Sequence, residues 1–145
     1  MRIAVLADTH DHYPPDLPER LRTADEIWHL GDVCDPKVLT AFEGLGPPVR
    51  VVLGNCDWYQ GWPREIRFEQ DGVRFLLVHI PPTRSPREID VVLHGHTHLV
   101  RNETDPQGVR WLNPGCISRP RGGAPASFAW LGVRPGHLDW RIVPL

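Results

Sequence analysis

The sequence has few cysteines and no long hydrophobic run. Only three cysteines, Cys34, Cys56 and Cys116, occur among 145 residues, and no two of them have CxxC spacing. An odd number without that spacing argues against a disulfide framework and is typical of reduced thiols in a cytosol. No segment approaches the ~20 apolar residues of a membrane-spanning helix, and the apolar run from Ile3 to Ala7 is too short for a signal peptide. We therefore expect a cytoplasmic protein that does not associate with membranes.

The chain also lacks an excess of charge of either sign. Sixteen Lys and Arg against 18 Asp and Glu give a formal net charge of −2, so nothing indicates an electrostatic surface for nucleic acid. A length of 145 residues fits one domain, and a chain of this size buries roughly two-thirds of its unfolded surface. We predict a single domain over residues 1–145. Exposed strand edges and spare tryptophans are compatible with a homodimer but do not require one.

The first third of the chain alternates strands and helices. Three apolar runs that end in polar residues predict buried strands, at residues 2–7, 26–32 and 49–55. Between them, residues 14–25 and 35–46 predict short helices. The first has Leu17 and Leu21 four apart on one face, and the second has Pro36 near its start and glycines at its end. This alternation is typical of the beginning of an α/β fold.

The helical signal fades from Ile66 onward. Residues 66–79 predict a hairpin that turns at Asp71-Gly72, a dipeptide suited to the positive φ of a tight turn. Further strands are predicted at residues 89–98, 109–115, 127–133 and 138–145. Turns containing proline and glycine separate them at short spacing, which favours stacked sheets over additional βαβ units.

The polar residues that follow these strands are all oxygen or nitrogen donors: Asp8, His10, Asp32, Asn55, His79, His96 and His98. Placing such residues repeatedly just past apolar strands is unfavourable unless a cation offsets their desolvation and mutual repulsion. In "LHGHTHL", residues 93–99, alternate positions share one face of an extended chain. Taken alone, that histidine row fits a polar strand face as well as a metal site. The complete set indicates a metal site.

Taken in order, the fragments "DTH", "GD", "GNCD", "H" and "GHTH" resemble the calcineurin-like metallophosphoesterases, over almost the whole chain. The form "GNCD", the small size and the late "NPG" followed by "PR" resemble the small YfcE-like phosphodiesterase branch of bacteria and archaea. The resemblance implies an α/β, four-layer fold in which two packed mixed β-sheets are flanked by helices, with a helix-poor C-terminal half. It also implies a phosphoesterase, for which phosphodiesters are the first expected substrate class and phosphomonoesters the other.

The resemblance further implies a binuclear metal centre. Asp8, His10 and His98 would hold the first metal, Asn55, His79 and His96 the second, and Asp32 would bridge both. Two divalent ions would activate a bridging water as the hydroxide that attacks phosphorus in line. Manganese is the first expectation, with nickel, iron, zinc or magnesium as the others. Asp32, Asn55 and His96 would thereby take part in catalysis as well as in metal binding.

Two departures from the family pattern affect this assignment. Cys56 stands where much of the family has a histidine that assists the leaving group, so protonation would fall to water or Asp57. The thiol would either leave space for substrate or only pack. Ile80 replaces the glycine that usually follows the ligand histidine, and the connector 80–89 is too short and proline-rich for the helix often found there. The assignment of His79 as a ligand is therefore the weakest of the seven. The short connector also covers less of that edge, so the site should be open enough for bulky diesters.

Several other residues near the motifs have a structural interpretation beside a functional one: His12; Trp58, Tyr59 and Trp62; Arg119 and Arg121. The histidine could touch a phosphate oxygen or merely be solvated. The three aromatic residues closely follow "GNCD" and could line the cleft as stacking surfaces, whereas the remaining tryptophans should belong to the core. The two arginines could bind substrate phosphate, although exposed loop arginines are commoner.

A protein-binding scaffold is the competing class of function, because the fold also resembles the metallophosphoesterase-like subunit of retromer, which has lost part of the metal set. All seven positions here carry ligand-type residues, and a scaffold role alone gives no reason to retain them. A mononuclear or purely structural metal site is a third possibility. Within the histidine row, we expect the strand to end and bend at Gly95. His96 and His98 would then reach different ions, and His94 would remain a flanking strand residue.

Overall fold

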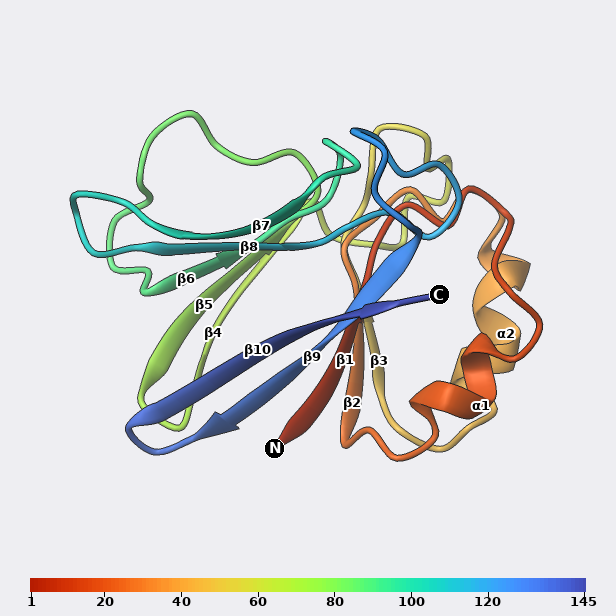
Figure 1. Cartoon of the computed structure of the whole chain (residues 1–145), viewed down its shortest axis with the longest axis horizontal. Helices are drawn as coiled ribbons and strands as arrows, with labels where there is room; N and C mark the ends of the chain where they lie inside the picture. Colours follow the sequence, from red (N-terminus) through yellow and green to blue (C-terminus); the bar gives the residue numbers. More distant parts are fainter.

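The computed structural model describes all residues, 1–145, and contains two mixed five-stranded β-sheets that face each other (Figure 1). The first sheet has the order β10-β9-β1-β2-β3, with β1 (Arg2–Leu6), β2 (Glu26–His29), β3 (Val49–Val51), β9 (Ser127–Arg134) and β10 (His137–Pro144). The second has the order β4-β5-β6-β8-β7, with β4 (Glu65–Gln70), β5 (Val73–Val78), β6 (Val91–Leu93), β7 (Val100–Thr104) and β8 (Arg110–Pro114). The predicted α/β fold with two packed mixed sheets is confirmed.

The core between the sheets is made of alternate residues from facing strands. Val5 and Trp28 of the first sheet belong to the same buried cluster as Phe75, Leu93 and Leu112 of the second. Burying a side chain of this size contributes about 1.5–3 kcal/mol. The strands β1, β2 and β3 pair in parallel, as do β5, β6 and β8. The loops that follow these strands therefore meet at one edge of the molecule.

Helices cover only the first sheet. They are α1 (Leu17–Leu21), the 3₁₀ helix η1 (Pro36–Leu39) and α2 (Thr40–Glu43), and they lie together on one side of the molecule (Figure 1). Leu6 packs with Leu17, Leu21 and Phe42 in the cluster beneath them. Both predicted helices are present, although shorter than their sequence patterns. None is long and apolar enough to cross a membrane.

The outer face of the second sheet has no helix. Ile89, from the connector between β5 and β6, instead packs with Leu76, Val92 and Trp111 on that face. The helical layer that the resemblance implies is thus present on one side, and the short proline-rich connector replaces it on the other. The hairpin turn is as predicted, because Asp71 and Gly72 both have positive φ, 51° and 79°.

Two details differ from the sequence predictions. Strand β7 was not predicted, because its mostly exposed residues lack hydrophobic alternation. It forms by antiparallel pairing with β8. Strand β6 ends at Leu93 rather than at Gly95, although the backbone N–H of His94 still donates to Leu112 at 3.0 Å.

Candidate metal centre

The seven predicted ligand residues lie together at the edge where the parallel strands end. Asp8 and His10 follow β1, Asp32 follows β2, Asn55 follows β3, His79 follows β5, and His96 and His98 follow β6. Nε2 of His10 is 3.1 Å from Oδ2 of Asp32, and Nε2 of His79 is 3.3 Å from the same oxygen. The fold thus brings the donors of both sheets to one point. Their function as metal ligands remains a prediction.

Asp8 is the most deeply buried carboxylate of the group. Its side chain is fully buried, and Oδ1 has no hydrogen-bond partner. Nε2 of His98 lies 3.5 Å from Oδ1, and Nε2 of His79 lies 3.9 Å from it. Burial raises the pKa of Asp8, because removing a carboxylate from water disfavours its charged form. A cation at this position would satisfy the oxygen that the protein leaves without a partner.

Asp32 lies between the two histidine groups. Its Oδ1 accepts a hydrogen bond from the backbone N–H of Cys56 at 2.8 Å, which leaves Oδ2 facing His10 and His79. Burial opposes ionisation, but the hydrogen bonds with His79 and the Cys56 backbone outweigh it and hold the pKa of Asp32 well below its usual range. Asp32 is therefore an ionised carboxylate at neutral pH, directed toward two imidazoles.

A hydrogen bond to the backbone fixes the orientation of the buried His79 imidazole. Its Nδ1–H donates to the backbone carbonyl of Leu30 at 2.7 Å, since a carbonyl can only accept. In the neutral ring Nε2 then carries a lone pair, yet it faces the acceptor Oδ1 of Asn55 at 2.9 Å as well as Asp32. Such an arrangement needs a proton or a cation between the acceptors. Burial lowers the pKa of His79, but the hydrogen bond and charge of Asp32 outweigh this and raise it.

His98 has the same support, because its Nδ1–H donates to the carbonyl of Arg119 at 2.8 Å. Metal-ligating histidines commonly donate their second N–H to a carbonyl or carboxylate in this way. The departure at Ile80 thus does not displace His79, which lies at the centre of the group. His96 is nearer the surface, and its Nδ1 is 3.0 Å from Oδ1 of Asn55.

Backbone strain is concentrated at the same residues. Five of the seven have left-handed φ values: Asp8 (58°), His10 (44°), Asp32 (59°), His96 (69°) and His98 (61°). For residues other than glycine such conformations cost of order 1–3 kcal/mol each, and they cluster at functional sites. The loops therefore maintain an unfavourable backbone geometry that directs these side chains toward one another.

The expected bend at Gly95 is wrong in its location. Gly95 does not have positive φ; the left-handed residues are His96 and His98 themselves. Glycine is favoured at position 95 for a different reason, because an added Cβ would lie 3.0 Å from Cβ of Ala7 and 3.1 Å from Oδ2 of Asp8. The missing side chain lets the histidine loop approach the loop that carries Asp8.

His94 supports this loop without reaching the centre. It is buried, its Nδ1–H donates to the carbonyl of Gly95 at 2.9 Å, and its Nε2 accepts from the guanidinium of Arg101 at 3.2 Å. Burial lowers the pKa of His94 to about 4, so the ring is neutral at neutral pH. The side-chain amide of Asn113 donates to the same carbonyl at 3.2 Å and to Oγ1 of Thr97 at 3.1 Å.

Two supporting residues were missed by sequence reasoning. Asn113 belongs to the "NPG" motif, which indicated a family branch but no role. Oγ of Ser118 is 2.8 Å from Nδ1 of His10 and donates to the carbonyl of Asp8 at 2.8 Å. No local signal identifies a serine that lies 108 residues beyond the histidine it contacts.

The "GNCD" loop is held by its own aspartate. The carboxylate of Asp57 accepts hydrogen bonds from the backbone N–H groups of Asp32 (2.9 Å), Cys34 (2.7 Å) and Gly54 (2.7 Å). It is thus directed into the backbone of two loops. Cys56 is exposed, and its Sγ lies within 4.8 Å of ligand atoms of His10 and Asp32. Although the residue as a whole is exposed, partial burial of its thiol raises the pKa of Cys56. The negative charge of Asp32 is the next cause.

The remaining candidates lie at the periphery. His12 is exposed. Trp58 and Tyr59 follow the "GNCD" loop with 65% and 43% of their surface exposed, and Trp62 packs edge-on against Tyr59 with ring centroids 5.1 Å apart. Arg119 is exposed and reaches the centre through its backbone carbonyl alone. Arg121 is also exposed.

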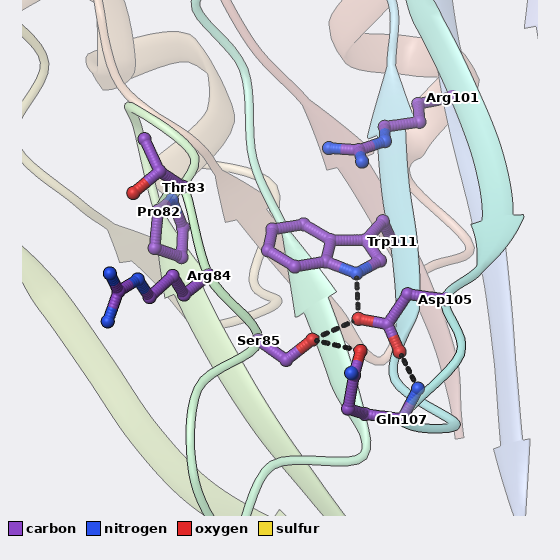
Figure 2. Close-up of a pocket in the computed structure, with 8 residues that line it drawn as sticks. All are labelled: Pro82, Thr83, Arg84, Ser85, Arg101, Asp105, Gln107 and Trp111. Carbon is purple, nitrogen blue, oxygen red and sulfur yellow. Dashed lines mark hydrogen bonds between the residues drawn. The ribbon is translucent and has the colours of Figure 1, made fainter.

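A second polar region lies on the outer face of the second sheet. It is a pocket of about 500 Å³ between the connector and strands β7 and β8, and none of the seven predicted ligands lines it. Figure 2 shows Ser85 and Trp111 directed toward Asp105, and the side chain of Gln107 directed toward Ser85. That carboxylate accepts from Ser85, from Nε1 of Trp111 at 2.9 Å and from backbone N–H groups. The hydrogen bond from Ser85 is the main cause that lowers the pKa of Asp105 to about 2.

Comparison with known proteins agrees with the resemblance seen in the sequence. Residues 1–136 match the calcineurin-like phosphoesterase superfamily domain. The chain belongs to this family. It is 33% identical over 163 aligned positions to a probable metallophosphoesterase of Methanothermobacter thermautotrophicus, covering 99% of this chain and 92% of that protein. It is 30% identical over 135 positions to the phosphodiesterase YfcE of Escherichia coli, covering 89% of this chain and 71% of that protein.

Solved structures share the fold. The structure of E. coli YfcE, a phosphoesterase, superposes with a TM-score of 0.76 at 24% identity, covering 99% of both chains. Vps29 of Entamoeba histolytica in complex with Zn²⁺ superposes with a TM-score of 0.77 at 22% identity, also covering 99% of both chains. The family implies divalent metal ions. The donor set here fits them, because it combines carboxylate, amide and imidazole groups around a buried oxygen that has no partner.

Proposed function

We propose that this protein is a binuclear, metal-dependent phosphoesterase that hydrolyses phosphodiesters in preference to phosphomonoesters. One observation carries the proposal: the fully buried Oδ1 of Asp8 has no hydrogen-bond partner, and the imidazoles of His79 and His98 are anchored with Nε2 toward it. Relatives named metallophosphoesterase and phosphodiesterase support the reaction class.

In this proposal Asp8, His10 and His98 hold one ion, Asn55, His79 and His96 hold the other, and Asp32 lies between them. Two divalent ions, when bound, supply the Lewis acidity that activates water and offsets negative charge on the phosphate oxygens. Oxygen and imidazole donors without a thiolate fit manganese first, with nickel, iron, zinc or magnesium as the other candidates.

The residues of the chain contribute orientation and charge. The hydrogen bonds to Leu30 and Arg119 fix the two anchored rings, so no side-chain reorganisation is needed when substrate arrives. Asp32 stays ionised and keeps the centre selective for cations. His96 lies beside Asn55 near the surface, where it can contact a phosphate oxygen of the substrate.

The residues of the "GNCD" loop indicate which group can give a proton to the leaving group. Cys56 has a raised pKa, so its thiol remains protonated at neutral pH and is a weak acid. The carboxylate of Asp57 is occupied by backbone donors, and we assign it a positioning role. Water therefore supplies the proton, and the small thiol leaves room for a bulky ester group beside the exposed ring of Trp58.

Metal reconstitution tests the proposal. Protein freed of metal with a chelator would receive Mn²⁺, Ni²⁺, Zn²⁺ or Mg²⁺, and the hydrolysis of bis(4-nitrophenyl) phosphate and 4-nitrophenyl phosphate would be followed. We expect two bound ions by mass spectrometry and faster turnover of the diester. His137→Ala, an exposed change at the start of β10, is the control. No turnover with any metal, together with fewer than two bound ions, would overturn the proposal.

A scaffold function is the alternative, and the shared fold of the Vps29 structures favours it. Under that alternative the protein would bind metal but hydrolyse neither ester. The retention of all seven ligand-type residues and the concentrated backbone strain favour catalysis.

A further inference from the structure

A small pocket adjoins the candidate metal centre on the side of the second sheet. It has a volume of about 210 Å³, and two predicted ligands, Asn55 and His79, form part of its wall. The rest of the wall consists of Leu53, Gly54, Val78 and Ile80 together with Arg64. A group seated there would therefore lie beside the second proposed metal position.

Arg64 has no acidic partner. Five of the 15 arginines form ion pairs with carboxylates, and Arg64 is one of the ten that do not. It is an exposed residue. Its neighbour Glu65 is already paired with Arg67 at 3.1 Å. A hydrogen bond from the N–H of Leu53 to the carbonyl of Pro63 at 2.7 Å closes the base of the loop. This bond keeps Arg64 beside the strand end that leads to Asn55.

The pocket wall has two chemical characters. Ile80 is exposed over 51% of its surface, a large apolar side chain directly after a candidate ligand, and Val78 precedes that ligand. Opposite character comes from the guanidinium of Arg64, a fork of donors that matches carboxylate or phosphate oxygens. A water occupies about 30 Å³ in the liquid, so the space suits a short substituent and not a whole nucleotide.

We propose that this pocket binds a second anionic group of the substrate, a carboxylate or phosphate on a short hydrocarbon arm, and that Arg64 recognises it. The inference rests on the proposed phosphodiesterase function and names its substrate class: diesters in which one ester arm carries a negative charge. The arm lies along Ile80 and Val78, and its charged end pairs with Arg64. During hydrolysis water oxygen bonds to phosphorus, the bond to the other ester oxygen breaks, and the charged arm stays on the phosphate product.

Two 4-nitrophenyl phosphodiesters of similar size test this inference. In one the second arm is propyl, and in the other it is 2-carboxyethyl, so the terminal methyl is replaced by a carboxylate. Manganese-loaded wild-type protein should have a KM about tenfold lower for the carboxyethyl ester, as expected for one charge-assisted hydrogen-bonded pair. Arg64→Gln should abolish that preference and leave the propyl ester within about twofold. Arg67→Gln, an ion-paired arginine on β4, is the matched control and should keep the preference.

Binding of phosphonates separates the two proposals. The Kd of 3-phosphonopropionate should be about tenfold below that of propylphosphonate, and Arg64→Gln should remove the difference. Equal KM and Kd values for charged and uncharged arms, or a preference that survives Arg64→Gln, would overturn the anionic subsite while leaving phosphodiesterase activity intact. Absence of turnover on either ester would instead overturn the proposed function, and the phosphonate titration would then test the pocket alone.

Discussion

Two carboxylates of this protein, the half-buried Asp105 and the buried Asp8, have opposite hydrogen-bonding environments. On the outer face of the second sheet, Asp105 accepts hydrogen bonds from Ser85, Trp111 and backbone N–H groups. At the strand ends, Asp8 is fully buried and leaves Oδ1 without any partner. One carboxylate stabilises its loop with ordinary backbone geometry, and the other lies among residues with left-handed φ values.

The difference shows how a structural carboxylate can be told from a functional one. A satisfied carboxylate contributes to stability through the bonds it accepts. An unsatisfied and buried carboxylate is unfavourable for folding, so its retention needs another reason, and a bound cation supplies one. The outer pocket is therefore not the candidate active site, because its one carboxylate is already hydrogen-bonded.

The largest expected difference between the regions is catalytic. His98→Ala or His96→Ala should lower kcat/KM for a chromogenic phosphodiester at least about 100-fold, since losing even a residue that only hydrogen-bonds to a metal ligand costs about 10–100-fold. Trp111→Phe and Asp105→Asn, in the outer pocket, should change it less than about twofold. His94→Ala should also leave activity largely intact, because that ring contacts Gly95 and Arg101 and does not reach the candidate metal centre. Comparable losses in both regions would contradict the separation.

Metal content gives the second test of the comparison. His79→Ala should bind about one equivalent less metal than the wild type, because its Nε2 faces Asp32 and Asn55. His137→Ala should bind the wild-type amount. Metal analysis after gel filtration measures both. Unchanged stoichiometry with full activity in His79→Ala would remove this residue from the ligand set.

Stability should report on the loop that supports the centre. Asp57→Ala would leave three backbone N–H groups without their acceptor, at about 1 kcal/mol or more each. We expect the free energy of unfolding to fall by about 3 kcal/mol in urea titrations. Asp57→Asn keeps one acceptor oxygen and should lose less. If Asp57→Ala were as stable as the wild type, the positioning role would be wrong.

A smaller effect should appear at low pH in the outer pocket. The pKa of Asp105 is lowered to about 2 in the folded protein, against about 3.9 for an unperturbed aspartate. A depressed pKa means that its stabilisation is complete above about pH 4 and is lost as the pH falls toward 2. The stability difference between wild type and Asp105→Asn should therefore narrow over that interval. A difference independent of pH would show that the carboxylate charge does not contribute.

The strand ends could be predicted from the sequence because each ligand follows an apolar run. Parallel pairing then brings those ends to one edge, so local patterns were enough to predict that the candidate ligands lie together. The exposed strand β7 could not be predicted, because pairing with β8 and not hydrophobic alternation creates it. The sequence predicted a bend at Gly95, since glycine is the residue that usually adopts left-handed φ values, whereas His96 and His98 adopt them here.

The supporting contacts were also beyond sequence reasoning. Ser118, in the loop between β8 and β9, reaches His10 across 108 residues of sequence. Asn113 reaches the Gly95 carbonyl because β8 pairs with β6. The assignment of His79 depended on the connector after it, and its anchoring to Leu30 comes from the neighbouring sheet. Long-range contacts of this kind have no periodic signal in the chain.

The most direct test of the central claim compares Asp8→Asn with Asp105→Asn in the absence of metal. Asparagine tolerates the left-handed φ of Asp8, 58°, so the substitution chiefly removes a buried charge. We expect Asp8→Asn to raise the free energy of unfolding of the metal-free protein by about 1 kcal/mol, and to lose the stabilisation that Mn²⁺ gives the wild type. Asp105→Asn should do the reverse, with lower stability and unchanged response to Mn²⁺. A destabilised metal-free Asp8→Asn protein that Mn²⁺ still stabilises fully would contradict the claim that Asp8 is retained for a cation.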